Sequence, residues 1–237
     1  MTANDEDQSL GPRIDASAAP RPERVTLKGR FVTVAPLALE HAEALFQYSH
    51  GPGRDEVWTY LFNGPFKDRA EFAADVEAKA KAADPFYFAV LDVRDGRPLG
   101  YQSLMRIDPA NRVIEVGGIM YTAALQRTAG ATEAQYLFAR YVFDDLGYRR
   151  YEWKCNNRNL PSKRAALRLG FTFEGVFRQH MIVKGHNRDT AWFSMLDSEW
   201  PSRRAAFEAW LAPDNFDPEG RQKQSLAALR SAANHYP

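Results

Sequence analysis

Two stretches decide the fold: Gln126-Arg-Thr-Ala-Gly-Ala-Thr-Glu-Ala134 and Asn159-Leu-Pro-Ser-Lys-Arg-Ala-Ala-Leu-Arg-Leu-Gly-Phe171. The first follows the apolar run Val113–Tyr121, so we expect a strand that leads through a turn of small residues into a helix. The first turn of a helix leaves backbone N–H groups free and carries a partial positive charge. Small residues at 129–131 would let a phosphate approach these donors. The alternative is a tight turn that packs a helix close to a sheet.

The second stretch predicts a short helix with ordinary start and stop signals. Pro161 and Ser162 should begin it, because proline is favoured at the first helical position. Gly170 should end it in the left-handed conformation. Asn159 would end the preceding turn and Ser162 would cap the helix, which is what these residue types commonly do.

Composition predicts a soluble globular protein without a nucleic-acid or membrane partner. The 237 residues are 45% hydrophobic and 13% aromatic, and 31 basic and 30 acidic residues give a net charge of +1. We expect one main domain at 25–212, preceded by a flexible tail at 1–24 and followed by a C-terminal extension at 213–237.

Compartment and metal content follow from the termini and the cysteine count. The N-terminus is acidic and has no apolar signal core, and no apolar run is long enough to span a membrane. We therefore expect a cytoplasmic protein. Cys155 is the only cysteine, which excludes an internal disulfide and a cysteine-rich metal site, and we expect no metal.

Periodicity and turn residues predict a mixed α/β fold. The helix between the strand 113–121 and the strand 151–155 implies a right-handed parallel crossover. The other predicted elements are a broken strand or hairpin at 25–34, helices at 39–50 and 68–83, hairpin strands at 86–92 and 99–107, a helix through 131–142, a closing hairpin at 171–183 and 190–196, and a last helix from 198 or 201 to 211 followed by a polar tail.

This order of elements and motifs resembles the GNAT superfamily of acyl-CoA-dependent N-acetyltransferases, particularly its RimJ/RimL-like branch, over about residues 25–200. The resemblance implies a mixed central sheet with two splayed parallel strands, flanked by helices. It also implies acetyl-CoA as co-substrate, with its pyrophosphate held by amides of a Gln/Arg-x-x-Gly-x-Gly/Ala turn. That pattern fits Gln126-x-x-Ala129-x-Ala131 or, shifted by one, Arg127-x-x-Gly130-x-Thr132. The cofactor turn thus comprises Gln126, Arg127, Thr128, Ala129, Gly130, Ala131 and Thr132.

The Asn-x-x-Ser spacing matches a second motif of that family. By this resemblance, Asn159 would bond the pantetheine arm, and Ser162 would bind the cofactor and protonate the leaving thiolate. The thioester would enter the gap between the splayed strands, where a main-chain N–H near Ile119 or Met120 would polarise its carbonyl.

The general base has two candidates. Glu115 lies on the strand before the cofactor turn, where some family members place a carboxylate that acts through water. Its alternative is a salt bridge across the sheet to Lys154 or Arg106. His180 lies on the strand after Gly170-Phe171 and would substitute for a carboxylate there, with a purely structural role as its alternative.

Three further features have two readings each. Cys155 is a nucleophile for two-step transfer or a buried structural thiol. Lys163, Arg164 and Arg168 reach the coenzyme 3′-phosphate or form a solvated face. The aromatic residues Trp58, Tyr60 and Phe62 line the acceptor cleft or belong to the core.

The function that we predict is acetyl transfer from acetyl-CoA to a primary amine by direct attack in a ternary complex. The acceptor is a protein N-terminus or a small amine or amino acid, and the protein is a monomer or homodimer. The rival is a non-catalytic acyl-CoA-binding sensor that uses the same turn.

Overall fold

The computed structural model describes residues 11–233, and the predictions for the two chain ends lie partly outside this range. One eight-stranded sheet has the order β1-β2-β3-β4-β5-β6-β8-β7. The strands are β1 (Leu27–Lys28), β2 (Val32–Pro36), β3 (Phe86–Asp92), β4 (Pro98–Asp108), β5 (Val113–Tyr121), β6 (Arg150–Asn156), β7 (Thr172–Val183) and β8 (His186–Leu196). All neighbours are antiparallel except β5 and β6, which are parallel as predicted.

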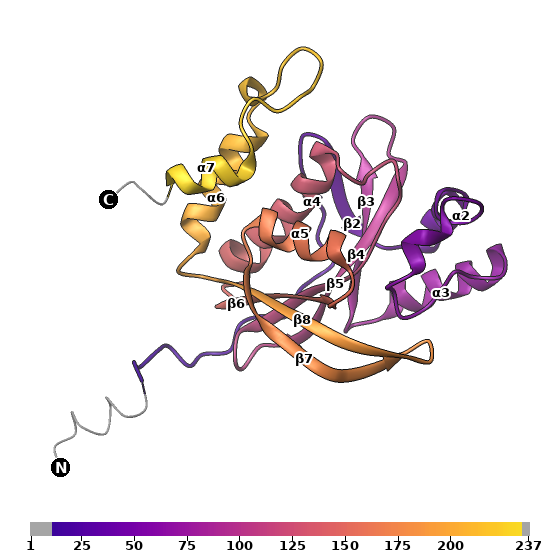
Figure 1. The fold of residues 1–237 in the computed structure, drawn as a ribbon, viewed down its shortest axis with the longest axis horizontal. Coiled ribbons are helices and arrows are strands. Elements are labelled where there is room, and N and C mark those ends of the chain that lie inside the picture. The colour runs from indigo at the N-terminus through magenta and orange to yellow at the C-terminus, as the bar shows by residue number, and fades with distance from the viewer. Residues whose placement is uncertain (1–10, 234–237) are drawn as a thin grey trace.

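Helices cover both faces of this sheet (Figure 1). They are α2 (Ala42–Ser49), α3 (Arg69–Lys81), α4 (Ala129–Arg140), α5 (Leu160–Leu169), α6 (Trp200–Leu211) and α7 (Leu226–Ala233), with short 3-10 turns at Leu39–His41, Asp55–Trp58 and Pro213–Asn215 and a π-helical turn, Tyr141–Asp145, that continues α4. The predicted mixed α/β fold with helices flanking the sheet is confirmed.

Alternation along the strands divides the apolar side chains between two cores. On β3, Phe88 and Val90 join the large cluster that packs against α4, while Ala89 joins a smaller cluster with residues of α2 and α3. Successive side chains of a strand point to opposite faces, so one strand serves both cores. The sheet is therefore covered on both sides at β3.

The parallel strands β5 and β6 separate at their carboxyl ends. Their pairing runs from Val113 opposite Arg150 to Val116 opposite Trp153 and then stops, although both strands continue. The register of β5 against β4 shifts between Tyr101 and Ser103, which marks a bulge at this point. The predicted splay of the two strands is thus present, and a gap opens beyond Val116.

Residues 213–233 are more structured than the predicted polar tail, and this part of the sequence prediction was wrong. Leu226 is buried, and α7 packs against α5 and α6 (Figure 1). Asn215 is buried and its amide donates to the carbonyl oxygens of Trp210 and Gln224, at 3.0 and 3.2 Å. Apolar side chains, among them Leu226 and Phe216, and hydrogen bonds from Asn215 and Arg230 attach this segment to the domain.

The segment 11–24 contains no helix or strand, yet it is attached to the edge of the domain. Ala19 is buried and its N–H donates to the carbonyl of Pro109 at 3.0 Å. Arg112 forms an ion pair with Asp15, at 2.7 Å, and donates to the carbonyl of Ser17. The division of the chain into tail, domain and extension remains a prediction.

Within residues 11–233, no helix combines the length and apolar character that a membrane span requires. The same residues contain no group of three or more His, Cys, Asp or Glu side chains arranged to hold a metal ion.

Candidate acyl-transfer site

One cavity of about 1170 Å³ brings most of the predicted site residues together. It is lined from the carboxyl half of β5, the first turns of α4 and α5, the end of β6, and the loop after Trp58. It therefore lies at the gap between β5 and β6. Its lining includes the predicted residues Glu115, Ile119, Gln126, Arg127, Thr128, Ala129, Ala131, Thr132, Asn159 and Ser162, whereas Met120, Gly130 and His180 are absent from it.

The α4 turn presents free backbone donors. Thr128 caps the helix: its hydroxyl accepts from the N–H of Ala131 at 3.2 Å and donates to the carbonyl of Leu125 at 2.7 Å. Among the described residues, the N–H groups of Arg127, Ala129 and Gly130 have no hydrogen-bond acceptor. Such donors at a helix N-terminus suit an anion.

The Cα of Gly130 faces the sheet, while the binding of the cofactor by its backbone N–H stays a prediction. It is buried, and a Cβ added to it would lie 2.8 Å from Cγ1 of Val32. Its small size therefore permits close packing of α4 on β2, which was the alternative interpretation of this turn. The cavity-lining positions Ala129 and Ala131 favour the register that begins at Gln126 over the shifted one.

Asn159 and Ser162 lie together at the start of α5. The Asn159 side chain accepts from the Ser162 N–H at 3.1 Å and so caps the helix. The Ser162 hydroxyl accepts from the indole Nε1 of Trp153 at 3.0 Å. The N-cap of α5 is therefore Asn159 and not Ser162, and both residues line the cavity.

Cys155 is the third group at this point. It is 5% exposed, and burial raises the pKa of its thiol, although a hydrogen bond with Ser162 opposes that rise. A protonated thiol is a weak nucleophile. Cys155 lines the cavity, but its protonation favours the structural interpretation.

Glu115 is buried in the cavity wall and is doubly ion-paired. Its Oε2 lies 2.7 Å from the guanidinium of Arg106 and 2.8 Å from the ammonium of Lys154. Both salt bridges left open by the sequence are present. The carboxylate nevertheless reaches the cavity, so its base role remains a prediction.

His180 lies elsewhere. It is exposed on β7, with its ring against Phe177 and Trp192 and its Nδ1 3.0 Å from the hydroxyl of Thr190. These contacts fit the structural alternative. Its absence from the cavity lining removes the geometric support for a base at this position.

The aromatic residues before α3 and the basic residues of α5 lie partly in the cavity lining and partly outside it. Trp58 is fully buried in the smaller core, whereas Tyr60 and Phe62 line the cavity. Arg164 and Arg168 also line it, and Arg168 donates to the hydroxyl of Thr132 at 2.9 Å, which ties α5 to α4. Lys163 instead donates to Asn157 at 2.8 Å.

Two further groups line the cavity: Tyr121, which the sequence offers as an alternative proton donor, and Arg188, which sequence reasoning missed. Tyr121 donates to Gln102 and accepts from Gln135 at 2.8 Å, and burial raises the pKa of Tyr121. Arg188 is a buried cation of β8. The alternation of β8, which places Arg188 on the face of Thr190 and Trp192, was the available signal.

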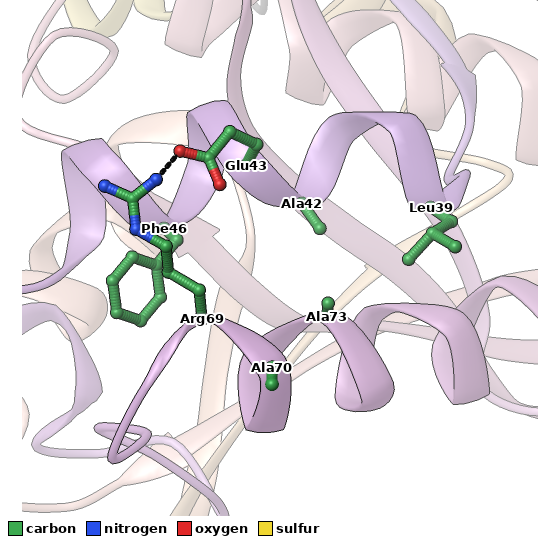
Figure 2. Close-up of a pocket in the computed structure, with 7 residues that line it drawn as sticks. All are labelled: Leu39, Ala42, Glu43, Phe46, Arg69, Ala70 and Ala73. Atoms are coloured by element: carbon green, nitrogen blue, oxygen red, sulfur yellow. Dashed lines mark ion pairs between the residues drawn. The ribbon is translucent and has the colours of Figure 1, made fainter.

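A second hollow of about 390 Å³ lies between α2 and α3, away from these residues. Figure 2 shows small and apolar side chains lining it, with an ion pair between Arg69 and Glu43 at its rim. It contains none of the predicted site residues.

Comparisons with known proteins agree with this geometry. The family model described as "Acetyltransferase (GNAT) domain" matches residues 32–172. A crystal structure of a GCN5-related N-acetyltransferase from Brucella melitensis is 52% identical, with a TM-score of 0.89, and the match covers 92% of this chain and 99% of that one. A GNAT-family protein from Chromobacterium violaceum, titled a probable acetyltransferase, is 37% identical over 81% of this chain and 96% of its own, with a TM-score of 0.75.

Among curated proteins, the N-acetyltransferase p20 of Bacillus licheniformis, named as uncharacterized, is 27% identical over 74% of this chain and 98% of its own length. The matched region contains β2 to α5, and with them the cofactor turn and the Asn159–Ser162 motif. The resemblance stated from the sequence is therefore confirmed. This chain belongs to the GNAT family and is an acetyltransferase.

Proposed function

We propose that the chain transfers the acetyl group of acetyl-CoA to a primary amine, by direct attack of the amine in a ternary complex. The observation that supports this most is the single cavity shared by the α4 turn, the Asn159–Ser162 motif and Glu115. A cofactor-binding end and a reacting end are thus connected through the gap between β5 and β6. Acetyl-CoA supplies the activated acetyl group, and proximity supplies much of the acceleration.

The residues present fit acetyl-CoA. The free N–H groups of the α4 turn would bind the pyrophosphate, and Arg127 adds a positive charge beside them. The amide of Asn159 would bond the pantetheine arm. The backbone near Ile119, where β5 leaves its neighbour, would polarise the thioester carbonyl.

Two proton movements complete the chemistry. The Ser162 hydroxyl would donate its proton to the departing thiolate while Trp153 holds its oxygen in place. Glu115 would accept a proton from the acceptor ammonium through water, since only the neutral amine attacks. The burial that keeps the Cys155 thiol protonated supports direct attack over a two-step route through that sulfur.

Initial-rate kinetics with a panel of amines test this proposal. We expect release of free thiol above the rate of hydrolysis and an acceptor whose mass increases by one acetyl group. The initial rates should follow the kinetic pattern of a ternary complex, and Cys155→Ala should keep that pattern. Tight acetyl-CoA binding without acetylation of any amine would support the sensor instead. A ping-pong pattern that Cys155→Ala abolishes would refute direct attack.

A further inference from the structure

Arg188 is a buried cation in the wall of the cavity. It is 7% exposed, it lines the cavity, and its Nε is buried without a hydrogen-bond partner. Within residues 11–233, no carboxylate forms an ion pair with it. An unpaired buried charge is costly, and arginine stays charged at physiological pH, so this residue is expected to serve a purpose other than stability.

The charges around Arg188 are already balanced without it. The Lys154 ammonium lies over the ring of Trp192. Arg188, Thr190 and Trp192 lie at alternate positions of β8 and therefore share one face of that strand. Consecutive ion pairs of 2.5–2.8 Å link three cations and three carboxylates in the order Arg106, Glu115, Lys154, Glu152, Arg150 and Glu174. Arg188 therefore adds one positive charge that nothing in this chain of ion pairs neutralises.

A loop covers this cation. The Phe62 ring centroid lies 5.1 Å from the Arg188 guanidinium carbon. The loop is held down from the tip of the β7–β8 hairpin, where the Lys184 ammonium donates to the carbonyls of Trp58 and Gly64 at 2.8 and 2.5 Å. Arg188 thus lies under an aromatic wall that limits its access to bulk water and strengthens its electrostatic interactions.

The groups that interact with Arg188 belong to the proposed reacting end of the cavity. Arg188 interacts electrostatically with both Cys155 and Glu115, and Cys155 is hydrogen-bonded to Ser162. The candidate phosphate-binding residues belong to α4 and α5. A ligand group bound by Arg188 would therefore belong to the acceptor.

We infer that Arg188 binds a carboxylate of the acceptor, so that the substrate is a small amine that also bears a carboxylate, as an amino acid does. This inference rests on the proposed N-acetyltransferase function. A guanidinium suits a carboxylate because its N–H groups match both oxygens at once. The buried, uncompensated position would make a neutral analogue a poor ligand, since the charge would remain unpaired.

The first test compares kcat/KM, expressed per neutral amine, for amino acids and for their amides, which lack the carboxylate and have a lower ammonium pKa. We expect the parent enzyme to prefer the carboxylate by about 30-fold or more, the scale for losing one partner of a buried charge pair. Arg188→Met should abolish this preference, and Arg188→Lys should retain part of it. Arg178→Met is the matched control, because Arg178 is exposed on β7 and outside the cavity lining.

The second test measures binding without turnover. Calorimetry of N-acetyl amino acids and their amides, with coenzyme A present, should show carboxylate-dependent binding that Arg188→Met removes while coenzyme A affinity stays constant. Equal acetylation of acids and amides, with Arg188→Met affecting both alike, overturns the inference and leaves the proposed function intact. Carboxylate binding without acetylation of any amine would support the inference about Arg188 and refute the proposed function. If Arg188→Met does not fold, the acid-to-amide ratios of the parent and of Arg188→Lys decide the matter.

Discussion

Removing the Ser162 hydroxyl should have two separable effects. Its oxygen accepts from the indole N–H of Trp153 at 3.0 Å, and Trp153 is only 6% exposed. Ser162→Ala leaves that buried donor without its partner, which should lower the free energy of unfolding by about 1–3 kcal/mol. The same change removes the proposed proton donor to the thiolate, which should slow acetyl transfer by about 100- to 10,000-fold.

A double-mutant cycle with Trp153→Phe separates these effects. Phenylalanine has no N–H, so Ser162→Ala in that background should cost little further stability, and the coupling energy should account for most of the single-mutant loss. The rate should follow Ser162 alone: Trp153→Phe retains the hydroxyl and should remain far more active than either variant without it. Urea unfolding gives the stabilities, and single-turnover acetylation gives the rates.

The refuting results are specific. If Trp153→Phe slows transfer as much as Ser162→Ala does, the hydroxyl acts through packing and not by proton donation. If Ser162→Ala reacts at the parental rate, the donor must be water or Tyr121, whose hydroxyl at present donates to Gln102. Asn159→Ala should behave oppositely to Ser162→Ala and chiefly weaken acetyl-CoA binding, because its amide is proposed to hold the ground state.

Three other changes test the surroundings of the site. Gly130→Ala gains about 1 kcal/mol of helix propensity, but it forces a Cβ to 2.8 Å from Val32, at a cost of about 1–3 kcal/mol. Chemical denaturation should therefore show an unchanged or mildly reduced stability, and calorimetry should show an unchanged acetyl-CoA affinity. A selective loss of acetyl-CoA affinity would contradict the packing role. Glu115→Gln should slow transfer most at low pH, where neutral amine is scarcest, and loss of the acidic limb in His180→Ala instead would move the base to His180. The Arg94 guanidinium lowers the pKa of Asp92 from 3.8 to about 2, so this pair stabilises the fold above pH 3.8 and ceases to do so as the pH falls towards 2. In Asp92→Asn the free energy of unfolding should depend less on pH between 3.8 and 2. An unchanged pH dependence would contradict this role.

Local signals predicted the elements around the site well. The apolar run 113–121, the small residues that follow it and the 3.6-residue period beyond them fix β5, the turn and α4. Pro161 and Gly170 mark the ends of α5, and Gly170 has the left-handed conformation, with φ of 100°, that a helix stop of this kind requires. These features depend on near neighbours in the chain, so a single sequence reveals them.

Features that depend on distant contacts were not predictable in the same way. The helix α7 has eight residues, and isolated helices of that length are marginal in water, so packing on α5 and α6 determines it. Arg188 is an ordinary arginine in sequence. The alternation of β8 gives its face, but the contact with Phe62, more than a hundred residues earlier, appears only in the fold. The close approach of Gly130 to Val32 of β2 likewise depends on a contact that its sequence context does not show.

The gap that makes the site has its own cause in sequence, in Gly117 and Gly118. A Cβ at Gly117 would lie 2.4 Å from the sulfur of Met105, and Gly118 has a φ of 57°, which side chains disfavour. The two glycines let β5 bulge against β4 immediately after its last pairing with β6, at Val116. The strands then part at the level where Cys155 and Ser162 line the cavity. A pair of glycines inside an otherwise apolar strand therefore permits the bulge at which β5 and β6 part.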